Sequence, residues 1–82
     1  MKTLVHLSVP SVSLRHDILL PADLMVGEGV GLLVEAAVEL SSGRYVSSGR
    51  EVLCLAESNI LLRPGHSFAE YGLKNGDHLI LL

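Results

Sequence analysis

The sequence predicts an α+β fold, in which one helix packs across a mixed sheet of four to five short strands. Aliphatic residues alternate with polar residues near both ends of the chain, as they do in strands with one buried face. Between them, residues 24–40 carry aliphatic side chains at helical spacing. With 82 residues, the chain is expected to form a single domain, residues 1–82.

The first two strands are predicted at residues 2–9 and 14–20, joined by a hairpin turn after Pro10. A turn centred on residues 11–12 pairs positions whose residue numbers sum to 23. In this register, the alternating aliphatic side chains of both strands lie on the same face of the sheet. On the inner side, Val5 pairs with Ile18, Leu7 with His16 and Val9 with Leu14; on the outer side, Leu4 pairs with Leu19 and His6 with Asp17.

A helix is expected after Pro21, with Asp23 as its N-cap. Its buried stripe is predicted to contain Val26, Val30, Leu33, Ala37 and Leu40. Three glycines near its start lower the helix propensity, so this end is expected to start late or fray. Burial of the stripe must therefore hold the helix.

The second half of the chain is predicted to contain short elements separated by turns. Residues 41–50 read as an exposed loop, and residues 51–56 and 60–62 as the third and fourth strands. A single helical turn is expected at 67–71, and a last strand at 78–82 after an Asn-Gly turn. The last strand must return beside the first to cover its edge.

Composition and charge exclude several classes of protein. The net charge of −3 argues against nucleic-acid binding, which needs lysine and arginine concentrated on one face. The most apolar stretch, residues 24–40, contains three glutamates and three glycines, so insertion into a membrane is not expected. The N-terminal residues do not form a secretion signal, and the only cysteine, Cys54, cannot form an internal disulfide. We therefore expect a cytoplasmic protein.

The C-terminal region resembles the end of a ubiquitin-like β-grasp domain. Residues 68–81, Phe-Ala-Glu-Tyr-Gly-Leu-Lys-Asn-Gly-Asp-His-Leu-Ile-Leu, follow that superfamily's order of apolar residue, tyrosine, aliphatic residue, Gly-Asp and alternating aliphatics. Residues 16–21, with the helix after them, are similar to the YukD/EsaB family of small cytosolic ubiquitin-like proteins associated with bacterial type VII secretion. The resemblance implies that the Tyr71 hydroxyl bonds backbone near residues 62–64.

The same resemblance implies a non-enzymatic interaction or adaptor protein, an accessory of type VII secretion whose partners are components of that system. A conjugated modifier or sulfur carrier needs a flexible tail ending in Gly-Gly, whereas this sequence ends Leu79-Ile80-Leu81-Leu82. Two alternatives stay open. The chain could be a truncated or processed modifier or carrier, or it could be the cytosolic domain of a larger membrane component of the secretion machinery.

No arrangement of residues predicts catalysis or a cofactor. The glycines at 27, 29 and 31 do not complete a nucleotide-binding pattern, and a close packing contact explains them better. Cys54 has no base near it in the sequence. His6, His78 and Asp17 share the predicted outer face, where a two-histidine, one-carboxylate metal site is conceivable, but polar surface decoration is favoured and no metal is predicted.

The outer face of the sheet is the predicted partner-binding site. A solvated face should be polar, and contiguous exposed aliphatic side chains mark a binding surface. By resemblance, ubiquitin-like domains commonly bind partners on the third and fifth strands. The expected occupant is a protein partner or a second copy of this chain, forming a homodimer. The predicted contact residues are Leu4, Leu19, Cys54, Ala56, Ile80 and Leu82.

Overall fold

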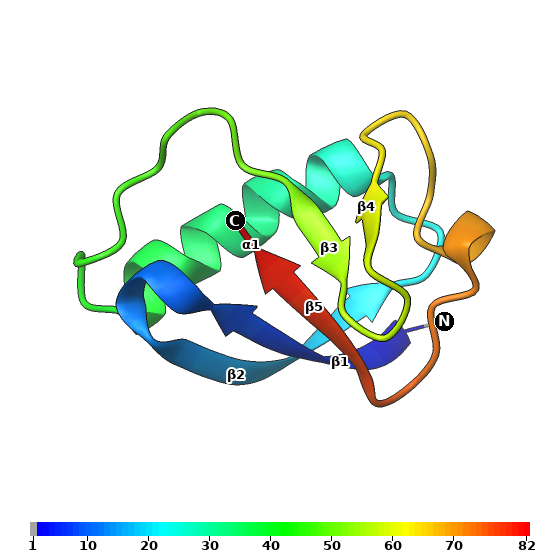
Figure 1. Cartoon of the computed structure of the whole chain (residues 1–82), viewed down its shortest axis with the longest axis horizontal. Coiled ribbons are helices and arrows are strands. Elements are labelled where there is room, and N and C mark those ends of the chain that lie inside the picture. The colour runs from blue at the N-terminus through cyan, green and yellow to red at the C-terminus, as the bar shows by residue number, and fades with distance from the viewer. Residues whose placement is uncertain (1) are drawn as a thin grey trace.

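The computed structural model describes residues 2–82, and it is a five-stranded mixed sheet with one helix across one face (Figure 1). The strands lie in the order β2-β1-β5-β3-β4. The elements are β1 (Lys2–Val9), a short 3₁₀ turn (Pro10–Val12), β2 (Leu14–Pro21), α1 (Val26–Leu40), β3 (Leu53–Leu55), β4 (Ile60–Leu62), a second 3₁₀ turn (Ala69–Tyr71) and β5 (Asp77–Leu81).

The sheet has the predicted pairing at both ends of the chain. In the β1–β2 hairpin, Val5 lies opposite Ile18 and His6 opposite Asp17, so the register in which residue numbers sum to 23 is confirmed. Strand β5 lies parallel to β1, with His6 opposite His78, and antiparallel to β3. The last strand therefore covers the edge of the first, as expected.

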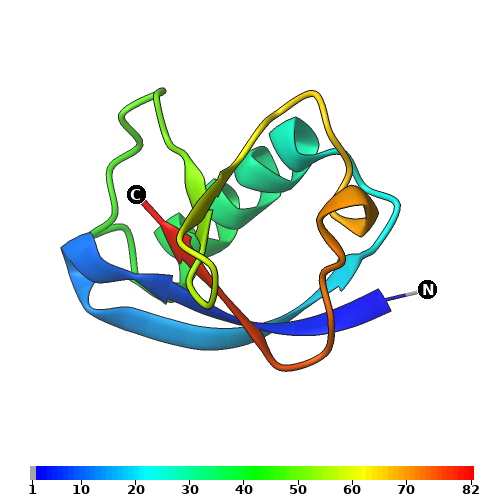
Figure 2. The ribbon, with the colours of Figure 1, turned by 45° about the vertical axis from the view of Figure 1, so that its right-hand side comes forward.

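The core lies between the sheet and α1, which crosses one face of the sheet (Figure 2). It is made almost entirely of aliphatic side chains. The alternate residues of β1 and β5 that face the helix are almost completely buried. Phe68, from the connection between β4 and β5, is completely buried as well. The core residues are Val5, Leu7, Val9, Leu20, Val26, Leu33, Ala37, Tyr45, Leu53, Leu55, Leu62, Phe68, Leu73, Leu79 and Leu81.

The predicted N-cap of the helix is wrong, although the helix begins later than that residue, as the glycines led us to expect. Helix α1 begins at Val26, with Met25 as an N-cap that makes no side-chain hydrogen bond, and Asp23 lies before it. The backbone supplies the partners instead: the Val26 N–H donates to the His66 carbonyl at 2.8 Å, and the Gly27 N–H donates to the Pro64 carbonyl at 3.1 Å. Because a distant segment satisfies these N–H groups, the helix needs no side-chain cap.

Two of the three glycines of α1, Gly27 and Gly29, lie at a close packing contact. A Cβ atom on Gly29 would lie 2.5 Å from Cε2 of Phe68, so only glycine fits at this crossing. A Cβ on Gly27 would approach that of Pro64 to 3.3 Å, whereas one on Gly31 would meet nothing within 4 Å. The prediction of a close packing contact is confirmed, and its partner is the segment that connects β4 to β5.

Three further predictions need correction. Leu40 is 40% exposed because it lies in the last turn of α1, beyond Ala37, the last buried residue of the stripe. His16 has inner-face parity but is exposed, because β2 is the edge strand. The third strand spans only Leu53–Leu55, shorter than predicted.

The segment 41–50 contains no helix or strand, as expected, but it is not exposed throughout. Ser41 and Tyr45 are buried, with 3% and 8% of their surface exposed. The Tyr45 N–H donates to Ser41 Oγ at 2.9 Å, and the Tyr45 hydroxyl donates to Glu51 Oε2 at 2.9 Å. Burial, with the added effect of Glu51, raises the pKa of Tyr45 to about 12.

The hydroxyl of Tyr71 accepts a hydrogen bond from the Arg63 N–H at 2.9 Å. The contact expected from the resemblance is therefore confirmed, and it ties the second 3₁₀ turn to the end of β4. No helix within residues 2–82 is long and apolar enough to cross a bilayer.

Candidate protein-docking face

The face of the sheet opposite α1 carries two rows of side chains that cross the strands. In the first row, Leu61 of β4 lies opposite Cys54 of β3, which lies opposite Ile80 of β5. Ile80 in turn lies opposite Ser8 of β1. The row is therefore aliphatic over β4, β3 and β5, and it becomes polar at β1.

We call this part of the outer face the aliphatic band. Leu61 is 58% exposed, and Cys54 and Ile80 are half-buried. The exposed side chains of Val52 and Leu82 extend the band at one end. The backbones of these two residues exchange hydrogen bonds of 3.0 and 2.9 Å. The band consists of Val52, Cys54, Ala56, Leu61, Ile80 and Leu82.

The second row is polar and runs beside the band. His6 of β1 lies opposite Asp17 of β2 on one side and opposite His78 of β5 on the other. His6 Nδ1 contacts Asp17 Oδ1, and His78 Nδ1 contacts Glu57 Oε2 at 2.6 Å. The backbone N–H and the imidazole of His78 lower the pKa of the Glu57 carboxyl.

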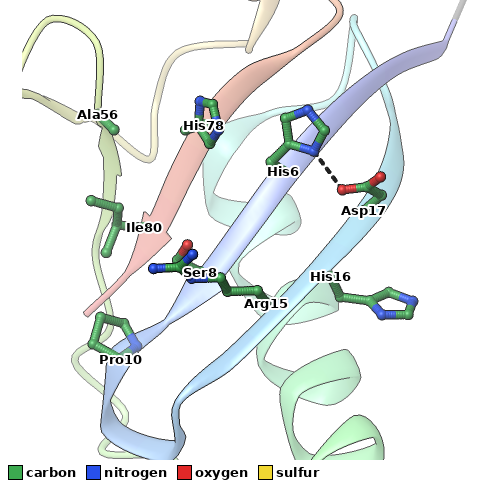
Figure 3. Close-up of a pocket in the computed structure, with 9 residues that line it drawn as sticks. All are labelled: His6, Ser8, Pro10, Arg15, His16, Asp17, Ala56, His78 and Ile80. Atoms are coloured by element: carbon green, nitrogen blue, oxygen red, sulfur yellow. Dashed lines mark hydrogen bonds and ion pairs between the residues drawn. The ribbon is translucent and has the colours of Figure 1, made fainter.

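A groove of about 930 Å³ lies where the two rows meet (Figure 3). Its polar part is made by His6, Arg15, Asp17 and His78, and Ala56 and Ile80 border it on the side of the aliphatic band. The side chains in Figure 3 project from three adjacent strands and from the end of β3. This face therefore offers a partner both apolar area and charge.

The six residues predicted from the sequence fall into two groups. Cys54, Ala56 and Ile80 lie together in the band, and Leu82 is at its end. Leu4 and Leu19 face each other at the opposite end of the β1–β2 hairpin, where Leu19 is 58% exposed. The row that contains His6 lies between the groups, so the six residues do not form one continuous apolar surface.

The sequence analysis missed Leu61 and Val52 in the band, and Glu57 beside His78. Leu61 could have been found from parity, because its neighbour Leu62 is a core residue and successive strand residues face opposite sides. Glu57 left no such signal, because its contact with His78 joins residues 21 positions apart across a turn.

The outer face also carries histidine and carboxylate side chains, which are potential metal ligands. Within residues 2–82, no group of three or more histidine, cysteine, aspartate or glutamate side chains is arranged to hold a metal ion. Asp17 contacts His6 while Glu57 contacts His78, so the side chains form two separate histidine–carboxylate pairs and not the conceivable cluster of two histidines around one carboxylate.

No protein-family model matches the sequence, and no curated protein matches it. Solved structures do match it. The ubiquitin-like domain of EccD5 from Mycobacterium xenopi is 19% identical, with a TM-score of 0.82 over 100% of this chain and 93% of that chain. The ubiquitin-like domain of the type VII secretion protein EccD1 from Mycobacterium tuberculosis is 18% identical, with a TM-score of 0.75 over 100% and 98%.

A chain of the MycP5-free ESX-5 inner membrane complex is also similar, at 20% identity and a TM-score of 0.79. The match covers 99% of this chain and 20% of that chain. At these identities the likeness shows the fold alone. The chain therefore has the ubiquitin-like β-grasp fold, and domains of the type VII secretion protein EccD are among the structures that it resembles.

Proposed function

We propose that this chain is a non-enzymatic protein-interaction domain of a bacterial type VII secretion system, which acts in the cytoplasm by docking a component of that system on the aliphatic band. The observation that carries the proposal is the band itself. On the face that α1 leaves uncovered, Leu61 of β4 is exposed beside the half-buried Cys54 of β3 and Ile80 of β5. The exposed side chains of Val52 and Leu82, which flank β3 and β5, continue this apolar surface. An uncovered sheet face without a partner should be polar.

The assignment to type VII secretion is supported by two independent likenesses. The fold is similar to ubiquitin-like domains of EccD5 and EccD1, and to part of a chain in the ESX-5 inner membrane complex. In sequence, residues 16–21 and the helix after them resemble the YukD/EsaB family. Both likenesses support the proposal of a ubiquitin-like domain associated with this secretion system.

The likeness to one-fifth of an ESX-5 complex chain favours a second form of the same proposal. In that form, the domain is the cytosolic part of a larger membrane component, and the band docks a neighbouring subunit. The open reading frame that encodes the chain distinguishes a separate accessory protein from a domain of a larger one.

Binding between the purified chain and the purified cytosolic portions of the type VII inner-membrane components of the same organism tests the proposal. We expect one of them to bind, and the double variant Ile80→Asp/Leu82→Asp to weaken that binding about tenfold or more, because charges would be buried in the contact. Leu32→Asp is the matched control, since Leu32 is 51% exposed but lies on α1.

Two results would contradict the proposal. Either none of the components binds, or the double variant binds as tightly as the unmodified chain while remaining folded. Light scattering on the same samples measures whether a second copy of the chain occupies the band instead, which would make this face a homodimer interface.

A further inference from the structure

Two imidazole rings lie side by side at the centre of the outer face. His6 of β1 and His78 of β5 are opposite each other in the parallel register, and their ring centroids are 4.9 Å apart with the planes tilted by 37°. Figure 3 shows both rings on the same side of these neighbouring strands. The side chains remain accessible, with 39% of His6 and 55% of His78 exposed.

Each ring is held by its own carboxylate. Asp17 of β2 contacts Nδ1 of His6, and Glu57, which follows β3, contacts Nδ1 of His78 at 2.6 Å. Glu57 is itself held, because its Oε1 accepts a hydrogen bond of 3.1 Å from the His78 backbone N–H. The two carboxylates therefore approach the pair of rings from opposite sides.

These contacts decide which nitrogen is free. An ionised carboxylate can only accept hydrogen bonds, so the Nδ1 atom that faces it must carry the proton. In the neutral ring, the Nε2 atom then keeps its lone pair. A histidine that donates from one nitrogen to a carboxylate and offers the other to a metal is the usual arrangement of imidazole ligands in metalloproteins.

We propose that His6 and His78 together bind one divalent transition-metal ion of the zinc or copper class through their Nε2 atoms. Zinc–nitrogen bonds of about 2.0–2.1 Å in tetrahedral geometry need the two nitrogens about 3.3 Å apart. The ring centroids lie 4.9 Å apart, and both side chains are accessible, so rotation of the two rings would bring their Nε2 atoms onto one ion.

The ion would keep open coordination positions. No third histidine, cysteine or carboxylate within residues 2–82 completes a ligand cluster, so water fills the rest of the shell in the chain alone. The groove of about 930 Å³ leaves room for that water. A donor atom from a docked partner could replace it, although metal binding itself does not depend on the proposed function.

Titration of the intact chain with ZnCl₂, followed by calorimetry and by the NMR signals of the histidine side chains, tests this inference. We expect one ion per chain, with the largest changes at His6 and His78. Loss of an outer-shell carboxylate typically costs about 10–100-fold in metal affinity. His6→Ala and His78→Ala each remove a ligand itself, so each should weaken binding at least as much, by about tenfold or more. Asp17→Ala should weaken it about tenfold without changing the stoichiometry.

The chain offers a matched control. His66 pairs with Glu70 in the same way, with Nδ1 and Oε1 3.1 Å apart, but it lies outside the sheet. His66→Ala should therefore leave zinc affinity unchanged. MgCl₂, which prefers oxygen ligands, should not displace zinc.

Three results would overturn the inference: no zinc binding by the intact chain, the same loss of affinity in His66→Ala as in His6→Ala, or equal competition by MgCl₂. Thermal unfolding of each variant shows that the loss does not come from misfolding.

Discussion

The two faces of the sheet are built from the same strands, but the side chains of one face are buried in the core and those of the other are accessible to solvent. On the inner face, Leu79 and Leu81 of β5 are 0% and 2% exposed and lie in the core between the sheet and α1. On the outer face, His78 and Ile80 of the same strand remain accessible. Packing explains the inner residues completely, whereas nothing in the fold requires aliphatic side chains on the outer face. This difference is the reason for proposing that partners bind on the outer face.

Truncating neighbouring residues of β5 should separate the two faces most clearly. Leu79→Ala removes a completely buried side chain, so we expect it to lower the free energy of unfolding by about 2–5 kcal/mol. Ile80→Thr keeps a β-branched side chain on the outer face and should cost about 1 kcal/mol or less. Urea unfolding measures the loss of unfolding free energy in both variants. Equal losses would contradict the distinction between a packed inner face and an accessible outer face.

Glycine substitutions in α1 test how tightly the inner side is packed. Gly29→Ala places a Cβ atom 2.5 Å from Phe68, so the crossing must open, and we expect a loss of about 1–3 kcal/mol. Gly31→Ala meets nothing within 4 Å and should instead stabilise the helix by up to about 1 kcal/mol. Thermal unfolding should therefore shift in opposite directions, and a loss of stability in both variants would contradict the close contact with Phe68.

The link between β4 and the second 3₁₀ turn should matter less than core packing. Tyr71→Phe removes the hydroxyl that accepts the Arg63 N–H, so we expect a loss of about 1 kcal/mol. Amide hydrogen exchange at Arg63 should become faster in this variant. Unchanged exchange there would mean that the hydroxyl does not hold the end of β4.

The smallest expected effect concerns the segment that leads from α1 to β3. Burial and Glu51 raise the pKa of Tyr45 to about 12, from an ordinary value of 10.0. Folding therefore gains stability from the neutral phenol below pH 10, and this contribution is lost as the pH rises from 10.0 to about 12. In a Tyr71→Phe background, phenolate absorbance reports on Tyr45 alone.

In that background, Glu51→Gln should lower the pKa of Tyr45, because it removes a negative charge beside the hydroxyl. The pKa should stay above 10.0, because burial is the larger cause of the shift. An unchanged pKa would show that Glu51 has no part in holding this segment.

Local pattern in the sequence predicts the inner face well. Alternation along β1 and β2 was enough to give the register of their hairpin, because a slip of one residue would have exposed the aliphatic side chains. The start of α1 could not be predicted in this way. Asp23 is a good N-cap residue, but the carbonyls of Pro64 and His66, distant in the sequence, take its place.

The outer face was harder for the same physical reason. Parity identified Cys54 and Ile80, because each alternates with core residues of its own strand. Parity also assigns Leu61 to the outer face, but its position beside Cys54 depends on how β4 pairs with β3, which no local pattern determines. The carboxylate pairs are likewise products of tertiary structure, since Glu57 reaches His78 only after the sheet has formed.

The most direct test of the central claim is an NMR footprint of the complex between this chain and the type VII secretion component that binds it. We predict that the methyl signals of Leu61, Ile80 and Leu82 change most on binding, while those of Leu32 on α1 remain in place. If the largest changes instead fall on α1, or on the edge of β2 around His16, the outer face is not the docking surface and the account is wrong.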